Sequence, residues 1–177
     1  MKKLLWNSNC NWTSDEQCEA VIHALQGEKD LLVALPTSSG KSMVPMLATM
    51  LGSGKTFLVI VPLISLLEDW ERQLKSSGTR YSVFQCGIHI FPDSPIVLAT
   101  IDLVIKSDLI ECIGNVYTYE SFGEVVIDKV HNVLVSCKFW DCIRSVWQLW
   151  TLPFLVIAMS EILPICMEAS LISELYL

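Results

Sequence analysis

Features that would mark a membrane-spanning or secreted protein are missing from this sequence of 177 residues. The longest stretch without a charged residue lies between Arg144 and Glu161 and contains Pro153, whereas a helix that spans a bilayer needs about 20 apolar residues. Only three apolar residues stand between the amino-terminal lysines and Asn7, too few for the hydrophobic segment of a secretory signal. We therefore expect a protein with no membrane partner that stays inside the cell, in the nucleus or another compartment.

Positive charge and closely spaced cysteines are also scarce. Lysine and arginine number 12 against 19 acidic residues, for a net charge of −7, which argues against a general basic surface for nucleic acid. The seven cysteines include no Cys-x-x-Cys pair and the three histidines are scattered, so the sequence lacks the close ligand pairs of zinc sites. The pattern favours reduced, buried thiols.

Apolar residues, in contrast, make up 52% of the chain, and the mean hydropathy of +0.47 excludes an intrinsically disordered protein. The length favours one domain with a sizeable core. Apolar runs of strand length recur at Leu31–Leu35, Thr56–Val61, Ser82–Cys86, Ile96–Ile101, Glu124–Ile127 and Phe154–Met159. Several of them are continuously apolar, as strands are when a parallel sheet is covered on both faces.

Segments long enough for helices lie between these runs. We expect helices at Ser14–Leu25, Lys41–Leu51, Ile64–Lys75, Leu103–Cys112 and Phe139–Leu149. The first has an N-cap candidate in Thr13 or Ser14, with acidic residues in its first turn. The alternation of strands and helices predicts an α/β three-layer sandwich around a mostly parallel sheet.

One segment carries a recognisable chemistry. The apolar run LLVAL is followed by Pro-Thr-Ser-Ser-Gly-Lys-Ser at residues 36–42 and then by a predicted helix. A strand, a loop of small residues, Gly-Lys-Ser and a helix form the context of a phosphate-binding loop. Backbone N–H groups and the helix N-terminus would face the phosphates, Lys41 would reach the β- and γ-phosphates, and Ser42 would ligate Mg²⁺.

At this loop the sequence resembles a known family. LPTSSGKS (35–42) is similar to the first motif of superfamily 2 DEAD/DEAH-box helicases, and TFLVIVPLISLLEDW (56–70) is similar to the second motif of their RecQ-like branch, which typically ends in Gln where this chain has Trp70. IVLATIDLV (96–104), VVIDKVH (125–131) and LVIAMSEILP (155–164) follow in the family's order. The resemblance implies a single RecA-like P-loop NTPase domain that uses ATP and Mg²⁺.

The resemblance also implies roles for matching residues. Gln17 would read the adenine edge, with Trp12 stacked on the base. The phosphates and magnesium would be held by Thr37, Ser38, Ser39, Gly40, Lys41 and Ser42. Asp128 would complete the Mg²⁺ shell, and His131 would couple the nucleotide to the DNA-binding side. Family members touch the nucleic-acid backbone, single-stranded DNA in this branch, at the positions of Pro62, Ser65 and Thr100.

Three positions depart from the family pattern. Lys129 replaces the DEAH glutamate, which is the general base that activates water. Loss of a general base typically lowers the rate by a factor of about 10²–10⁴. Ser38 replaces a glycine in a loop that favours positive φ. Met159, Ser160 and Glu161 stand where the family has Thr-Ala-Thr. We therefore expect ATP binding with weak or absent hydrolysis.

The resemblance leads to an expectation for the domains. Residues 1–177 would be the first RecA-like domain, truncated after the third motif, without the second domain and its arginine finger, which is worth about 10³–10⁵ in rate. Such a chain would not unwind DNA alone, although another helicase domain in trans would supply the missing half. The alternative hypothesis is an inert helicase remnant that acts as a protein-interaction module or has no function. A small P-loop kinase is disfavoured because the only arginines, Arg72, Arg80 and Arg144, do not cluster.

Overall fold

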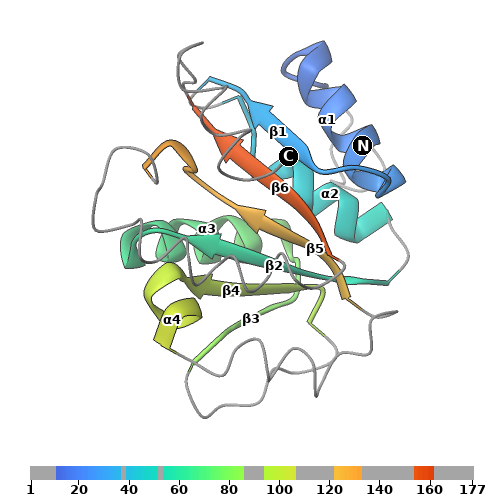
Figure 1. Cartoon of the computed structure of the whole chain (residues 1–177). Helices are drawn as coiled ribbons and strands as arrows, with labels where there is room; N and C mark the ends of the chain where they lie inside the picture. The colour runs from blue at the N-terminus through green and yellow to red at the C-terminus, as the bar shows by residue number, and fades with distance from the viewer. Residues whose placement is uncertain are drawn as a thin grey trace.

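A computed structural model of the chain describes residues 11–36, 39–51, 54–85, 94–106, 122–132 and 154–161. Within these residues a six-stranded sheet has the order β1-β6-β5-β2-β4-β3, and every neighbouring pair is parallel (Figure 1). The strands are β1 (Leu31–Ala34), β2 (Thr56–Val61), β3 (Tyr81–Val83), β4 (Ile96–Thr100), β5 (Phe122–Ile127) and β6 (Leu155–Ser160).

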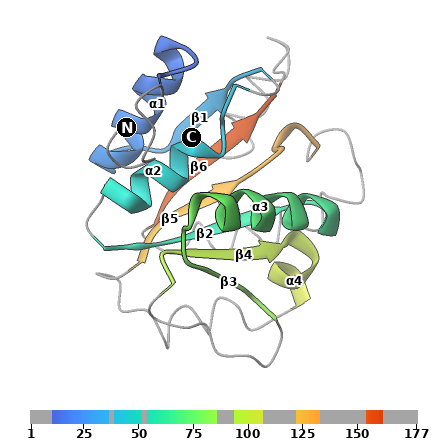
Figure 2. The ribbon, with the colours of Figure 1, turned by 180° about the vertical axis from the view of Figure 1, so that it is seen from behind.

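Helices lie on both faces of this sheet. They are α1 (Asp15–Gln26), α2 (Met43–Leu51), α3 (Ile64–Ser77) and α4 (Ile101–Lys106). Figure 2, seen from behind, shows α1, α2 and α3 on one face of the sheet, and Figure 1 shows α4 on the other. The three-layer α/β sandwich expected from the sequence is therefore confirmed, and the sheet is parallel throughout the described residues.

The helix ends follow local sequence signals. Ser14 caps α1, since its side chain accepts a hydrogen bond from the Gln17 N–H, and Gly27 ends the helix in the left-handed conformation with φ +59°. Gly78 ends α3 in the same way with φ +69°. Helix α2 begins at Met43, two residues later than predicted, because Lys41 is part of the turn that precedes it.

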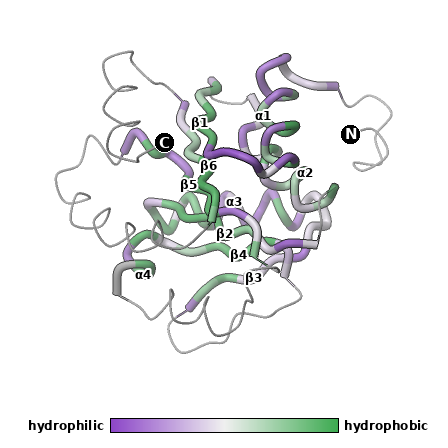
Figure 3. Tube along the Cα trace, turned by 45° about the vertical axis from the view of Figure 1, so that its right-hand side comes forward, coloured by the Kyte–Doolittle hydropathy of each residue, from purple (hydrophilic) through white to green (hydrophobic). Residues whose placement is uncertain are grey.

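The core lies mainly between the sheet and helices α1, α2 and α3. Alternate residues of β2, such as Val59, face this core together with Leu98, Val126 and Ile157 of the neighbouring strands. The intervening residues, such as Ile60, are also buried. Figure 3 shows the central strands as hydrophobic segments of the trace. Burial on both faces explains why these strands are continuously apolar rather than alternating.

All six predicted strands are present, although Ile101 begins α4 instead of extending β4. The fourth predicted helix corresponds to α4, and its remaining predicted residues, from 107 to 112, lie outside the described residues, as does the whole of the predicted helix 139–149. No helix among the described residues combines the length and apolar character needed to cross a membrane.

Candidate functional site

The Gly-Lys-Ser segment lies at the carboxyl end of β1, in the turn that leads into α2. Lys41 is only 9% exposed, and its Nζ donates to the carbonyl oxygens of Leu35 at 2.8 Å and Pro36 at 2.9 Å. Burial lowers the pKa of Lys41; Lys129 acts in the same direction and Glu161 opposes it. The ammonium group is thus held within the loop by neutral acceptors, which a phosphate oxygen is able to replace.

Gln17 braces this loop from α1. Its buried side chain donates from Nε2 to the Gly40 carbonyl at 3.0 Å and accepts from the Thr13 N–H at 3.0 Å. The Thr13 hydroxyl donates to the Ser39 carbonyl at 2.6 Å. Gly40 has φ +74°, and a Cβ atom at this position would lie 2.5 Å from Gln17 Nε2, so both the backbone conformation and the contact with Gln17 require glycine.

Asp128 follows β5 and points toward the same end of the sheet. Its Oδ2 accepts a hydrogen bond from Trp70 Nε1 at 2.9 Å, and its Oδ1 accepts from the Lys129 N–H at 2.8 Å. Lys129 itself has φ +55°, in the left-handed region that few non-glycine residues adopt. Each carboxylate oxygen has more than one lone pair. The carboxylate is therefore held in one orientation and retains acceptor capacity.

Glu161 joins two lysines just after β6. Its Oε1 forms an ion pair with Lys129 Nζ and lies 3.9 Å from Lys41 Nζ. All three side chains are largely buried, with exposed fractions of 9% to 22%. One carboxylate therefore faces the ammonium groups of both the loop lysine and the lysine that stands at the general-base position.

His131 connects the end of β5 to the end of β6. Its Nδ1 is 2.9 Å from the Ser160 hydroxyl. Burial lowers the pKa of His131, and the charge of Lys129 acts in the same direction. A neutral imidazole hydrogen-bonded to the neighbouring strand links the segment after Asp128 mechanically to the segment that ends in Glu161.

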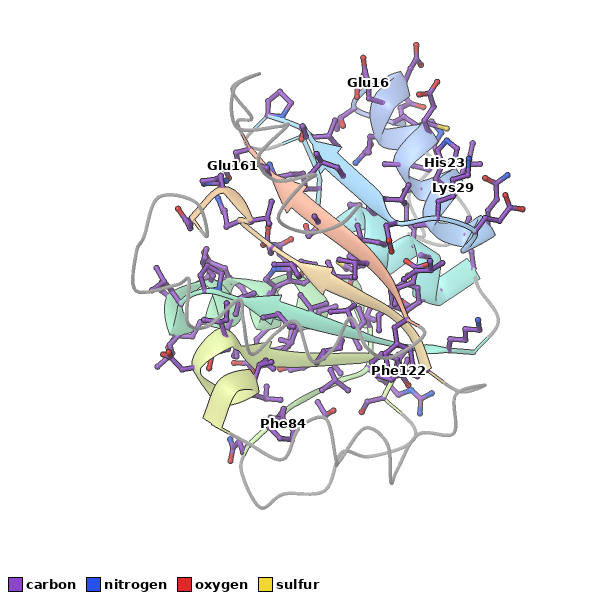
Figure 4. All side chains as sticks on the ribbon, in the orientation of Figure 1. Glu16, His23, Lys29, Phe84, Phe122 and Glu161 are labelled. Atoms are coloured by element: carbon purple, nitrogen blue, oxygen red, sulfur yellow. The ribbon has the colours of Figure 1, made fainter. Side chains whose placement is uncertain are left out.

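Lys41, Asp128 and Glu161 face a cleft of about 490 Å³ at the carboxyl edge of the sheet. It is lined by Gly40, Lys41, Ser42, Leu66, Asp69, Trp70, Gln73, Asp128, Lys129 and Glu161. The Ser42 hydroxyl donates to Gln73 Oε1 of α3 across this cleft. In Figure 4, the labelled Glu161 marks this end of the sheet and Phe122 marks the opposite end. The carboxyl edge is where open α/β sheets bind their ligands.

The family model of the DEAD/DEAH box helicase matches residues 14–160, which include the loop, Asp128 and every described strand. This chain belongs to the DEAD/DEAH box helicase family. Among curated relatives, it is 32% identical over 132 residues to the ATP-dependent helicase SGS1 of Saccharomyces cerevisiae and 46% identical over 55 residues to the ATP-dependent DNA helicase RecQ of Synechocystis. These matches cover 66% and 31% of this chain, and place it within the RecQ-like branch.

The chain spans only about a tenth of the length of these relatives, 9% of the yeast helicase and 11% of the cyanobacterial one. The fold is shared with the Sulfolobus solfataricus SWI2/SNF2 ATPase core in complex with dsDNA, at a TM-score of 0.59 and 18% identity over 87% of this chain and 32% of that one. This likeness agrees with a RecA-like α/β domain.

Several residues that the helicase motifs singled out lie away from the cleft or outside the described residues. Thr37 and Ser38 lie outside the described residues. Trp12 is exposed ahead of α1. Pro62 directly follows β2, and Thr100 ends the adjacent strand β4, where it is the register partner of Val61. Ser65 is exposed in the first turn of α3. These last three positions therefore share the carboxyl edge with the cleft.

Three contacts in this helicase domain were not predicted from the sequence: Trp70 with Asp128, Gln73 with Ser42, and Glu161 with Lys129. The first two depend on how α3 packs, and no local pattern indicates them. The third contact, between Glu161 and Lys129, was indicated by the sequence. Lys129 and Glu161 are two departures from the family motifs, they have opposite charges, and the motifs that contain them end neighbouring parallel strands.

Proposed function

We propose that this chain binds Mg²⁺-ATP in the carboxyl-edge cleft, as the first RecA-like domain of a RecQ-like DNA helicase, and that it hydrolyses ATP slowly or not at all. The observation that supports binding most strongly is the convergence of Lys41, Ser42 and Asp128 on one cleft behind a loop braced by Gln17. Relatives in this family are named as ATP-dependent helicases, so ATP is the nucleotide the cleft is expected to take.

The chemistry of the donors fits magnesium. Ser42 offers a hydroxyl oxygen and Asp128 a carboxylate, and both line the same cleft. Mg²⁺ prefers oxygen ligands and is commonly held by one or two carboxylates together with phosphate oxygens and water. The ion would neutralise phosphate charge, Lys41 would contribute a further positive charge, and Trp70 would hold Asp128 in place.

The expected weakness of hydrolysis depends on Lys129. An ammonium group has three donors and no lone pair, so it accepts no proton from an attacking water. Its ion pair with Glu161 gives Lys129 a structural partner and also places a negative charge beside Lys41, where the terminal phosphate would have to bind. The missing proton acceptor favours little turnover. The negative charge beside Lys41 favours weaker binding than in relatives that have the family residues at these positions.

DNA contact is the finer part of the proposal. Pro62 and Thr100 lie at the carboxyl ends of β2 and β4, and Ser65 lies in the first turn of α3. A single strand would cross the domain at this edge. The net charge of −7 predicts weak binding by this chain alone. We further propose that another helicase domain acts on this chain in trans. The proposed location is nuclear or otherwise intracellular. Unwinding is not expected from one RecA-like domain.

The first experiment is a titration of the folded chain with a fluorescent ATP analogue and Mg²⁺, beside Lys41→Ala and the matched control Lys29→Ala. Lys29 is exposed and lies outside the cleft. The proposal predicts saturable binding by the wild-type and control proteins and none by Lys41→Ala. Equal binding by all three would place the analogue elsewhere and overturn the assignment of the loop.

A second candidate is a nucleotide-free module that docks on another helicase domain. The observation in its favour is the pair of adjacent apolar residues Leu63 and Ile64, which are 55% and 70% exposed at the carboxyl edge. This candidate predicts no nucleotide binding by a folded chain, together with loss of partner binding in a Leu63→Ser, Ile64→Ser double variant.

A further inference from the structure

A second cavity lies at the amino-terminal edge of the sheet, opposite the nucleotide cleft. Its volume is about 310 Å³. The walls come from the last turn of α1, the second half of α2, the residues that begin β2 and β5, and Leu155 at the start of β6. Because all the strands are parallel, this edge is separated from the carboxyl edge by the length of the strands.

Glu124 of β5 lines this cavity and is only 5% exposed. Within the described part of the chain, its Oε2 atom is buried and has no hydrogen-bond partner. Buried polar atoms in folded proteins are nearly always paired, and an exception needs an explanation. Glu124 has no part in the nucleotide site, because it lies at the opposite end of β5 from Asp128.

The surroundings of Glu124 are electronegative. Helix α1 ends at Gly27, where a Cβ atom would lie 3.5 Å from Glu124 Oε1, so the negative end of the helix dipole points at the cavity. Burial raises the pKa of Glu124 to about 8, Lys55 lowers it and Asp30 raises it. Lys55, whose side chain is exposed, also lines the cavity. The carboxyl group is therefore mainly protonated at neutral pH and would ionise when a cation enters.

The remaining walls are partly apolar and partly polar, since Gln26 and Thr49 also line the cavity. Leu25, Phe57 and Leu155 line the cavity beside Glu124. A cavity of this size that combines apolar side chains with a few polar groups matches the general form of a small-molecule site. Once the carboxyl group has lost its proton, its unpaired Oε2 atom requires a donor, which an ammonium group supplies, and the apolar side chains suit a hydrocarbon body.

We propose that this cavity is a binding site for a small organic ammonium ion, whose charged nitrogen donates to Glu124 Oε2 and whose apolar body packs against Phe57 and Leu155. The site is independent of nucleotide binding. Entry of the ammonium ion displaces the proton of the Glu124 carboxyl group to solvent, so that one ion pair is formed and one proton is released.

The probe for this site is benzylamine, with benzyl alcohol as its neutral counterpart. Amide resonances of Gly27 and Gly123 are followed by NMR during titration of the wild-type chain, of Glu124→Gln and of the control Glu28→Gln, whose side chain is exposed. We expect saturable shifts in the wild-type and control proteins and a Kd raised by about tenfold or more in Glu124→Gln, the loss typical of an unpaired buried charge. Benzyl alcohol is expected to bind the wild-type protein and Glu124→Gln equally weakly.

Calorimetry provides the second measurement. At pH 7, benzylamine binding is expected to release a proton, so that the apparent enthalpies in phosphate and Tris buffers differ for the wild-type protein and coincide for Glu124→Gln. Equal affinity of benzylamine for the wild-type protein and Glu124→Gln would overturn the proposal, as would shifts confined to the Gly40 region. If the folded wild-type chain does not bind benzylamine but Lys55→Ala does, then Lys55 itself occupies the cavity. That result would also overturn the proposal. None of these results depends on ATP.

Discussion

The ion pairs of Glu161 lead to a prediction about nucleotide affinity. Two unit charges about 4 Å apart interact by about 4 kcal/mol at an effective dielectric constant of about 20, and Glu161 Oε1 lies 3.9 Å from Lys41 Nζ. Solvent reaches all three side chains, and screening reduces each such pair to about 1 kcal/mol or less. The carboxylate also pairs with Lys129. Removal of the Glu161 carboxylate is therefore expected to strengthen ATP binding by about 1–2 kcal/mol, because the carboxylate no longer competes with the phosphates for the two lysines.

The variant Glu161→Gln removes the charge and keeps the size of the side chain. We expect Mg²⁺-ATP to bind roughly 5- to 30-fold more tightly to this variant, the range that corresponds to 1–2 kcal/mol. The assay is the fluorescent-analogue titration at two salt concentrations, because the gain should shrink as ionic strength rises. Glu28→Gln makes the same change in net charge at an exposed position and serves as the control.

A Kd for Glu161→Gln that equals the wild-type value, or exceeds it, would refute the account of Glu161 as a competitor of the phosphates. A gain of equal size in Glu28→Gln would assign the effect to net charge alone. The double variant Lys129→Glu, Glu161→Thr restores the family residues at both positions. It should bind ATP better than Lys129→Glu alone, in which two carboxylates would face each other.

Three further predictions concern stability. Trp70→Phe removes the hydrogen-bond donor to Asp128. The Tm of thermal unfolding should fall by about 3–10 °C, as expected for a lost hydrogen bond to a charged group. An unchanged Tm would contradict the contact. Gly40→Ala should lower stability by about 1–3 kcal/mol because of its positive φ and the contact with Gln17, measured by urea unfolding; no loss would contradict the geometry. Because the folded-state pKa of Glu124 is raised from 4.5 to about 8, the folded protein holds a proton between these pH values that the unfolded chain releases, and its stability should fall as pH rises from about 5 to 8. Glu124→Gln should lack this decline, and parallel pH profiles would contradict it.

Much of the fold was predictable because it depends on periodicity and on local signals. The continuously apolar run of β2 indicated a strand buried on both faces, and Ser14 indicated the start of α1. The predicted helix included Lys41 because neither Lys41 nor Ser42 carries a helix-breaking signal. Strand order was not predicted, because it depends on pairings between segments far apart in the sequence.

The candidate site was predictable only where a motif carries its chemistry. Lys41, Ser42 and Asp128 were assigned by their resemblance to the helicase motifs, and the structure places all three on one cleft. The ion pair of Lys129 with Glu161 required the pairing of β5 with β6. Glu124 gave no signal in the sequence, because a glutamate within an apolar run has the same appearance whether it is paired, exposed or buried in a cavity.

A filter-binding measurement with radiolabelled ATP tests whether the cleft holds ATP with little or no turnover. The folded chain is incubated with Mg²⁺ and the labelled nucleotide, and the retained label is separated into ATP and ADP over several hours. We expect the wild-type protein to retain label that remains mainly ATP, and Lys41→Ala to retain none. Label that is not retained, or that is converted steadily to ADP in the wild-type protein but not in Lys41→Ala, would contradict this expectation.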